Sequence, residues 1–202
     1  MAGNVDIVNR ALSKLGDARI SSLNDKSKAA ALAASLFELV RDSEISSHSW
    51  NFAKTRVKLP AEADQPVFGF RWQYLCPSDC LRVLEAGPWP GPVTGPFISG
   101  ETRSFVLEGD RILSNSGPAL NLLYLRRVSD PALFPPSFIE ALAARLAVEM
   151  AESLTGSNSK RELAWKEYEQ TVKAARRLNA IGLPPRAVAD GSWMAAHLEG
   201  VI

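Results

Sequence analysis

The spacing of apolar residues changes twice along this chain of 202 residues, and these changes constrain its fold more than any single motif. Apolar residues recur every three or four positions up to residue 53, which predicts amphipathic helices. From Lys54 to Leu59 apolar and charged residues alternate, which predicts a half-buried strand. Helical spacing returns near residue 137. This order predicts helices, then strands, then helices again.

Two helices are predicted before the first change of spacing. The first follows Asn4, a suitable N-cap, and ends before Gly16, a residue that suits the left-handed position after a helix. Asn24 or Asp25 is predicted to cap the second helix, whose apolar stripe is rich in alanine. The two helices are expected to form an antiparallel hairpin.

Two further helices are predicted after the β region. Ser137 with Glu140 and Ser159 with Glu162 have the spacing of capping boxes. Gly156 between them is predicted to end the third helix. The apolar stripes of all four helices need partners, so both pairs are expected to share one core.

Several short strands are predicted between the helical pairs. Gly109-Asp110 separates two alternating runs and predicts a hairpin. The segment 87–100 is so rich in proline and glycine that it predicts a projecting loop. The predicted strands are Trp72–Cys76, Leu81–Glu85, Ser104–Glu108, Arg111–Ser114 and Leu120–Arg126.

These elements predict an α+β fold in which an antiparallel β insertion interrupts a four-helix body. The helical domain is expected to comprise residues 1–53 and 132–180. The β-rich inserted domain is expected to comprise residues 54–131. Residues 181–202 are expected to form an extended tail, because Pro184 and Pro185 interrupt helical spacing and the segment after them is short and mixed in character.

The composition disfavours several classes of protein. The formal net charge is +1 with a pI near 7.8, so no basic stripe for strong binding to nucleic acid is evident. Lys54, Arg56 and Lys58 share one strand face, where they could contact phosphate or simply be solvated. No stretch has the length and apolarity of a membrane span, and no secretory signal is recognised. Cys76 and Cys80 lack the further ligands of a zinc site and are expected to be buried free thiols.

No catalytic constellation is apparent, and no cofactor or metal motif is recognised. His48 ends an apolar helix beside Trp50, so a packing role is expected. His197 lies in the predicted tail, where no site could be preorganised. The chain is therefore expected not to be an enzyme.

Three groups of residues are candidates for structural or binding roles. The first is expected to be a helix–sheet junction, the second an interface loop, and the third a segment that binds a larger partner. An exposed aromatic side chain is a common interface anchor. The groups are His48, Trp50, Asn51 and Phe52; Trp89 and Phe97; and Leu183, Pro184, Pro185, Trp193, Met194, Leu198 and Ile202.

A series of motifs follows in a fixed order along the chain. The motifs are Asn9-Arg10-Ala11-Leu12, Leu15-Gly16, Ile20, Leu23, Arg41-Asp42, His48-x-Trp50-Asn51-Phe52-Ala53, Trp72-x-Tyr74, Pro77-Ser78-Asp79-Cys80-Leu81-Arg82, Phe134-Pro135-Pro136 with Phe138, and Leu142-Ala143-x-x-Leu146-Ala147. In this order they resemble the tail tubular protein A family, the head-to-tail adaptors of short-tailed bacteriophages. The similarity covers about residues 4–180, and the Trp-Asn-Phe-Ala and Pro-Ser-Asp-Cys-Leu-Arg motifs together are fairly specific.

The resemblance implies a structural protein of the virion, assembled in the host cytoplasm. It implies a ring, usually of twelve copies, that docks under the portal protein and prolongs the channel for double-stranded DNA. It also implies contacts with a tail nozzle or fibre protein. The family has no catalytic residues to carry over. Its C-terminal segment commonly reaches along the portal, which matches the position of residues 183–202.

Two alternatives from other classes remain open. A carbohydrate-active β domain would use Trp72, Tyr74 or Trp89 to stack on sugars and Glu85 or Glu101 as an acid. A small helical DNA-binding protein is the other alternative, and the balanced charge disfavours it.

Overall fold

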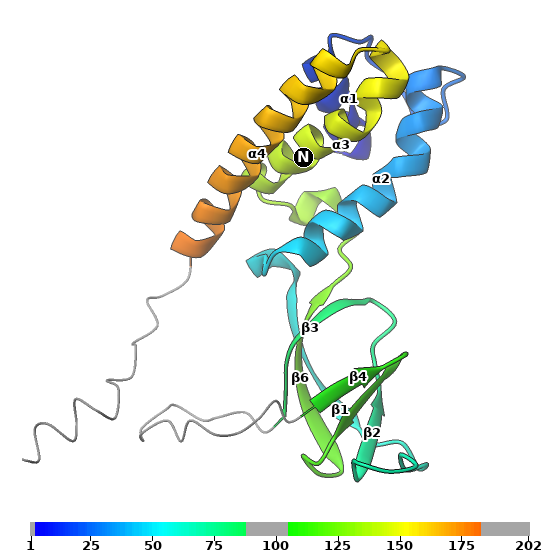
Figure 1. The fold of residues 1–202 in the computed structure, drawn as a ribbon, viewed down its shortest axis with the longest axis vertical. Coiled ribbons are helices and arrows are strands. Elements are labelled where there is room, and N and C mark those ends of the chain that lie inside the picture. The colour runs from blue at the N-terminus through cyan, green and yellow to red at the C-terminus, as the bar shows by residue number, and fades with distance from the viewer. Residues whose placement is uncertain (1–2, 88–104, 183–202) are drawn as a thin grey trace, which may run out of the picture. The chain divides into compact units, whose positions relative to one another are not determined.

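The computed structural model describes residues 3–87 and 105–182 and shows an α+β fold (Figure 1). The helices are α1 (Asn4–Leu15), α2 (Lys28–Ser47), α3 (Pro136–Thr155) and α4 (Asn158–Ile181). The strands are β1 (Lys54–Pro60), β2 (Trp72–Leu75), β3 (Cys80–Gly87), β4 (Phe105–Glu108), β5 (Arg111–Ser114) and β6 (Ala119–Arg126). Short 3-10 helices lie at Asn51–Ala53 and Pro131–Leu133. The predicted succession of helices, strands and helices is confirmed.

The chain divides into two compact units. Of the described residues, the helical unit comprises 3–55, 79–82 and 124–182, and the β unit comprises 56–78, 83–87 and 105–123. The strands β1, β3 and β6 each have residues in both units.

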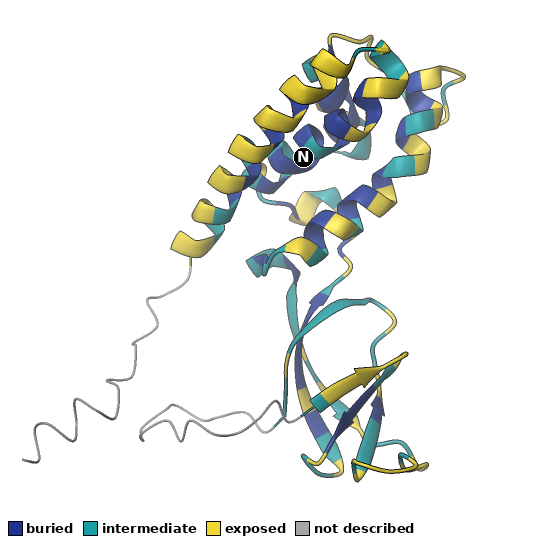
Figure 2. Ribbon diagram, in the orientation of Figure 1, coloured by how far each residue is buried: buried dark blue, intermediate teal, exposed yellow. Residues whose placement is uncertain are grey.

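The helix α3 forms the centre of the helical unit and packs against the other three helices (Figure 1). Small alanines let the neighbouring helices approach it closely, and its buried residues surround almost the whole helix (Figure 2). By contrast, α4 buries only one stripe and exposes its opposite face (Figure 2). The stripe on α4 consists of Ala164, Tyr168, Val172 and Ala175.

The helix ends differ from the predicted caps. Gly3, rather than Asn4, caps α1, and its N–H donates to the Asp6 carboxylate. Ser27 caps α2, whereas Asp25 accepts hydrogen bonds from the preceding loop. Both corrections have the same cause: several polar residues suit an N-cap, and only the packing of the helix decides which one is used.

The N-terminal caps predicted for α3 and α4 were also wrong. The helix α3 begins at Pro136, because a proline at the first helical position loses no hydrogen bond. Glu140 therefore pairs with Arg10 of α1 instead of closing a capping box. Ser157 caps α4 in place of Ser159. The glycine ends of α1 and α3 are confirmed, since Gly16 and Gly156 both have left-handed backbones, with φ of 70° and 62°.

The described strands form two three-stranded antiparallel sheets, with the orders β1-β6-β3 and β2-β5-β4. The hairpin predicted around Gly109 is confirmed, because Glu108 pairs with Arg111 and Gly109 has φ of 60°. The core of the β unit is small and includes Tyr74 and Ile112, both fully buried. Cys76 and Cys80 were expected to be buried, but both are half-buried.

Candidate functional site

The segment from His48 to Phe52 lies where α2 ends and β1 begins. The indole of Trp50 is almost completely buried, with 1% of the residue exposed, and its Nε1–H donates to the Glu44 carbonyl at 2.9 Å. This bond satisfies the one polar atom of a large apolar side chain. Trp50 therefore anchors the end of α2.

An aromatic cluster extends from this anchor to the start of α3. The ring of Phe138 lies 5.1 Å from that of Trp50 and 4.8 Å from that of Phe52, centroid to centroid. Phe134 completes the cluster at 5.6 Å from Phe52. Tilted and edge-on contacts of this kind stabilise aromatic pairs beyond their burial. Two motifs that are distant in the sequence thus share one core.

A pair of asparagines joins this segment to the last turns of α4. The Asn51 N–H donates to Asn179 Oδ1, and Asn51 Nδ2 donates to the Asn179 carbonyl, both at 2.8 Å. Asn179 Nδ2 in turn donates to the Ser49 carbonyl at 3.1 Å and lies 3.3 Å from His48 Nε2. The asparagine predicted as part of the junction thus binds a helix 128 residues further along the chain.

The motif Asp79–Arg82 reaches the same segment. Arg82 Nη2 donates to Ser49 Oγ at 3.0 Å. Asp79 accepts from the Tyr124 hydroxyl at 3.0 Å, and its carbonyl accepts from the Arg127 N–H at 2.7 Å. Burial, with the hydrogen bond to Asp79, raises the pKa of Tyr124 to about 12. Asp79 lies in the turn before β3 and thus bonds β6 and the residue that follows this strand.

The segment from His48 to Phe52, together with the residues that contact it from Asp79–Arg82, α3 and α4, is called the joint below. A buried carboxyl group lies on α2 close to this joint. Glu44 is only 3% exposed and accepts from the Tyr168 hydroxyl at 2.8 Å. Burial raises the pKa of Glu44, while the hydrogen bond from Tyr168 and the charges of Arg176 and Arg145 act in the opposite direction. Burial also raises the pKa of Tyr168 to about 12. Sequence reasoning missed this pair, although a glutamate on the apolar stripe of α2 was a signal.

The histidine of the joint is in a positive environment. Burial lowers the pKa of His48, and the charges of Arg176, Arg82 and Lys54 lower it further. Its ring lies edge-on to Trp50 at 4.9 Å. No described group of three or more His, Cys, Asp or Glu residues could hold a metal ion. The position of His48 suits packing and contact with an anion.

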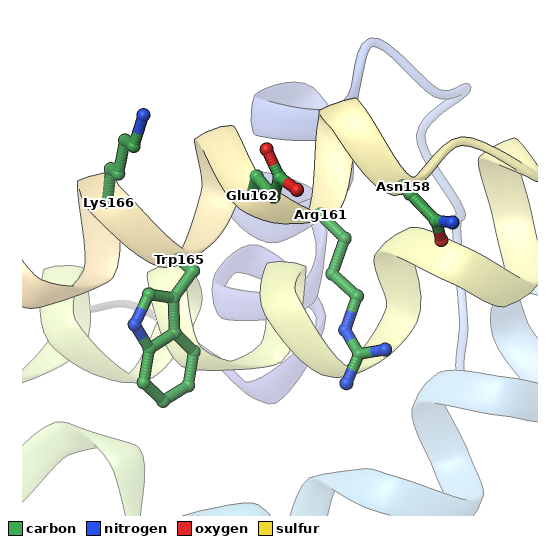
Figure 3. Close-up of a pocket in the computed structure, with 5 residues that line it drawn as sticks. All are labelled: Asn158, Arg161, Glu162, Trp165 and Lys166. Carbon is green, nitrogen blue, oxygen red and sulfur yellow. The ribbon is translucent and has the colours of Figure 1, made fainter.

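The helix α4 carries a separate surface hollow of about 560 Å³ (Figure 3). Its lining comes entirely from the first turns of that helix: Asn158, Arg161, Glu162, Trp165 and Lys166. Trp165 is 43% exposed, and the Arg145 guanidinium lies 5.6 Å from its ring centroid. Figure 3 shows Trp165 and Arg161 on the same side of the helix and Lys166 on the other. This open hollow was not predicted.

Adjacent apolar residues are exposed in the loop between β1 and β2. Val67 and Phe68 are 95% and 85% exposed. The flanking Pro66 and Gly69 were a sequence signal for a turn, but the apolar pair within it was overlooked. Tyr74, proposed for sugar stacking in one alternative, is fully buried and donates its hydroxyl to the Gly117 carbonyl. Its ring is therefore not accessible to a sugar.

The other predicted site residues lie outside the described part of the chain. They are the loop residues Trp89 and Phe97 and the tail residues Leu183, Pro184, Pro185, Trp193, Met194, Leu198 and Ile202. His197 lies outside it as well. Among the described residues, no helix has the length and apolarity to cross a membrane.

Comparison of the sequence with protein-family models finds no match, and comparison with curated proteins finds none. Arguments about function therefore depend on the sequence motifs and on the geometry of the joint.

Proposed function

We propose that this chain is a structural head-to-tail adaptor of a short-tailed bacteriophage. In this proposal, copies form a ring, twelve of them as is usual in the resembling family, between the portal protein and the tail nozzle or fibre protein. The ring extends the channel through which double-stranded DNA passes. The protein would be assembled in the host cytoplasm and remain in the tail connector of the virion. It would work through shape and contact rather than by turning over a substrate.

The observation that carries the proposal is the role of the resembling residues. The motifs around Trp50, Asp79 and Phe138 come from three distant parts of the sequence, and each contributes to one joint of the helical unit. Their side chains make aromatic contacts and hydrogen bonds within the protein. The residues that carry the resemblance contribute to packing within the protein. This role is consistent with a structural subunit.

Other resembling residues have similar roles. Asn9 donates from Nδ2 to the Ile20 carbonyl at 2.9 Å and accepts the Ile20 N–H at 2.8 Å, so it holds the loop after α1. Asp42 lies between Arg41 and Arg127, with contacts of 2.9 and 2.7 Å. In this proposal, Asn9, Arg41 and Asp42 stabilise a scaffold, and the scaffold presents surfaces to partners.

The ring is tested by electron-microscope images of the purified protein, alone and mixed with its portal protein. The proposal predicts rings with a central hole in at least one of these samples. Single particles of one subunit in both samples would contradict it.

The tail assignment needs a separate test. A variant that lacks residues 183–202 should keep the helical content and thermal stability of the full chain, because the described helices end before the deletion. It should no longer co-sediment with portal rings. Co-sedimentation equal to that of the full chain would contradict the portal-binding role of the tail. A full-length Leu39→Ala variant is the control, since Leu39 is exposed on α2 at 70%.

A further inference from the structure

Three cationic side chains converge on the short segment 47–51. They come from β1, β3 and α4, and each donates a hydrogen bond to a neutral oxygen of this segment. The bonds join Lys54 Nζ to Asn51 Oδ1 at 2.9 Å, Arg82 Nη2 to Ser49 Oγ at 3.0 Å, and Arg176 Nη2 to Ser47 Oγ at 3.4 Å. We call Lys54, Arg82, Arg176 and the neighbouring His48 the cation cluster.

The cluster differs from several arginines of the helical unit that are ion-paired. Several arginines elsewhere pair with carboxylates, including Arg10, Arg41, Arg127, Arg145 and Arg161. Within the ranges 3–87 and 105–182, by contrast, no carboxylate forms an ion pair with Lys54, Arg82 or Arg176. Their hydrogen bonds to hydroxyl and amide oxygens fix the side chains without neutralising them.

One carboxyl group lies near enough to act on the cluster electrostatically. Glu44 and Arg176 influence each other, but they are not in ion-pair contact. Burial raises the pKa of Glu44 and so opposes its charge. In addition, Nε of Arg176 is buried and lacks a hydrogen-bond partner. Glu44 therefore does not neutralise Arg176 through an ion pair.

The charges of the other three members of the cluster also act on His48. After burial, the charges that lower its pKa are those of Arg176, Arg82 and Lys54. All four members of the cluster are half-buried, so they remain accessible to a ligand. Four potential donors from four segments, with no ion-paired acceptor among them, form a site complementary to an oxyanion.

We propose that the cation cluster is a phosphate-binding site and that its occupant is the backbone of double-stranded DNA. The inference deepens the proposed function, because it names the part of the subunit that contacts the DNA in the channel. Lys54, Arg82 and His48 supply the direct contacts, while Arg176 forms the back of the site. A few phosphate contacts in each subunit agree with the near-neutral net charge, because they hold DNA weakly and let it move.

The salt dependence of DNA binding tests the direct contacts. Each phosphate contact contributes about 0.9 to the slope of log K against log salt concentration for duplex DNA. The full-length variant K54Q/R82Q should therefore lower the magnitude of that slope by about 1.8 relative to the unchanged protein. The slope is measured by fluorescence anisotropy of a labelled duplex at a series of salt concentrations, starting from low salt. Circular dichroism checks that the variant is folded.

A matched variant removes two cations elsewhere. Lys166 and Lys173 lie on the exposed face of α4, so K166Q/K173Q changes the net charge by the same amount without touching the cluster. Its slope should equal that of the unchanged protein. Equal losses in the two variants would show that only net charge matters, and no loss in K54Q/R82Q would remove the site. Either result would overturn the inference.

Nuclear magnetic resonance of His48 tests the chemistry of the ligand. Inorganic phosphate should shift the His48 ring resonances and raise the pKa of the imidazole, because a bound anion stabilises its charged form. His197, the other of the two histidines, provides a reference resonance. Acetate at the same ionic strength should shift His48 much less. An equal response to acetate would assign the site to carboxylates and overturn the phosphate inference.

The adaptor proposal and the proposal of a phosphate site can fail separately. Images of K54Q/R82Q should still show rings, since the hydrogen bonds of Lys54 and Arg82 to Asn51 and Ser49 lie within one subunit. Rings whose DNA binding is unaffected by K54Q/R82Q would contradict the phosphate site and leave the adaptor proposal standing. The absence of rings in the unchanged protein would contradict the adaptor proposal, whereas the response of His48 to phosphate would still decide the site.

Discussion

The helical unit and the β unit bury their apolar side chains in different ways. In the helical unit, α3 is enclosed by three helices, and the exposed apolar residues include Leu39 of α2 and Leu163, Leu178 and Ile181 of α4. In the described part of the β unit, apolar residues are exposed together, as at Val67 and Phe68. The comparison indicates that the helical unit is stabilised mainly by its own core, whereas the described part of the β unit leaves adjacent apolar side chains exposed.

The largest expected effect comes from the aromatic cluster of the helical unit. Phe138 is fully buried between Trp50, Phe52 and Phe134, so Phe138→Ala should leave a cavity. We expect a loss of about 3–5 kcal/mol in the free energy of unfolding. Urea unfolding followed by circular dichroism at a helical wavelength measures it. Leu39→Ala is the control and should change stability by no more than about 0.5 kcal/mol.

A core substitution in the β unit tests whether the two units are stabilised independently. Ile112 is fully buried on β5, between Tyr74 of β2 and Leu107 of β4 in the pairing register. Ile112→Ala should cost about 2–4 kcal/mol. Amide hydrogen exchange measures the effect separately for each unit. Faster exchange is expected on β2 and β5, with little change on α3.

Equal acceleration of exchange on α3 would contradict the comparison. It would show that the two units unfold as one cooperative body. Phe138→Ala supplies the reciprocal test, because its effect on the amides of β5 should be small.

The sequence predicted much of the fold, because the two periods of apolar residues are local signals. The order of the helices, the Gly109 hairpin and the glycine ends of α1 and α3 are confirmed. The N-caps were wrong because Asn24, Asp25 and Ser27 are all suitable locally. Only the packing of the complete helix selects Ser27.

The candidate site was less predictable, because its contacts join distant parts of the chain. The sequence identified Trp50 and Asn51 as junction residues, but not their partners Phe138 and Asn179. The sequence did not predict the cation cluster either. On the strand pattern, Lys54 was grouped with Arg56 and Lys58, whereas in the structure its amine points to Asn51. Such contacts depend on tertiary packing, which has no local period.

The smallest expected effect is a pH dependence of stability. It is expected in the helical unit and not in the β unit. Glu44 is the only buried carboxylate among the described residues, and it belongs to the helical unit. Because burial raises its pKa above the ordinary value of 4.5, the folded state binds the proton more tightly than the unfolded state. The stability that this group contributes is therefore present below pH 4.5 and is lost as pH rises through the raised pKa.

Glu44→Gln removes this titration and keeps a similar shape, and the Tyr168 hydroxyl can still donate to the amide oxygen. The variant should gain stability relative to the unchanged protein as pH rises above 4.5, and the gain should level off once pH exceeds the raised pKa of Glu44. Urea midpoints of the helical transition across this range measure it. Glu162→Gln, at an exposed position of α4, is the matched control. A stability difference that did not vary with pH would mean that Glu44 is solvated in solution, and the helical unit would then be less closed than its packing indicates.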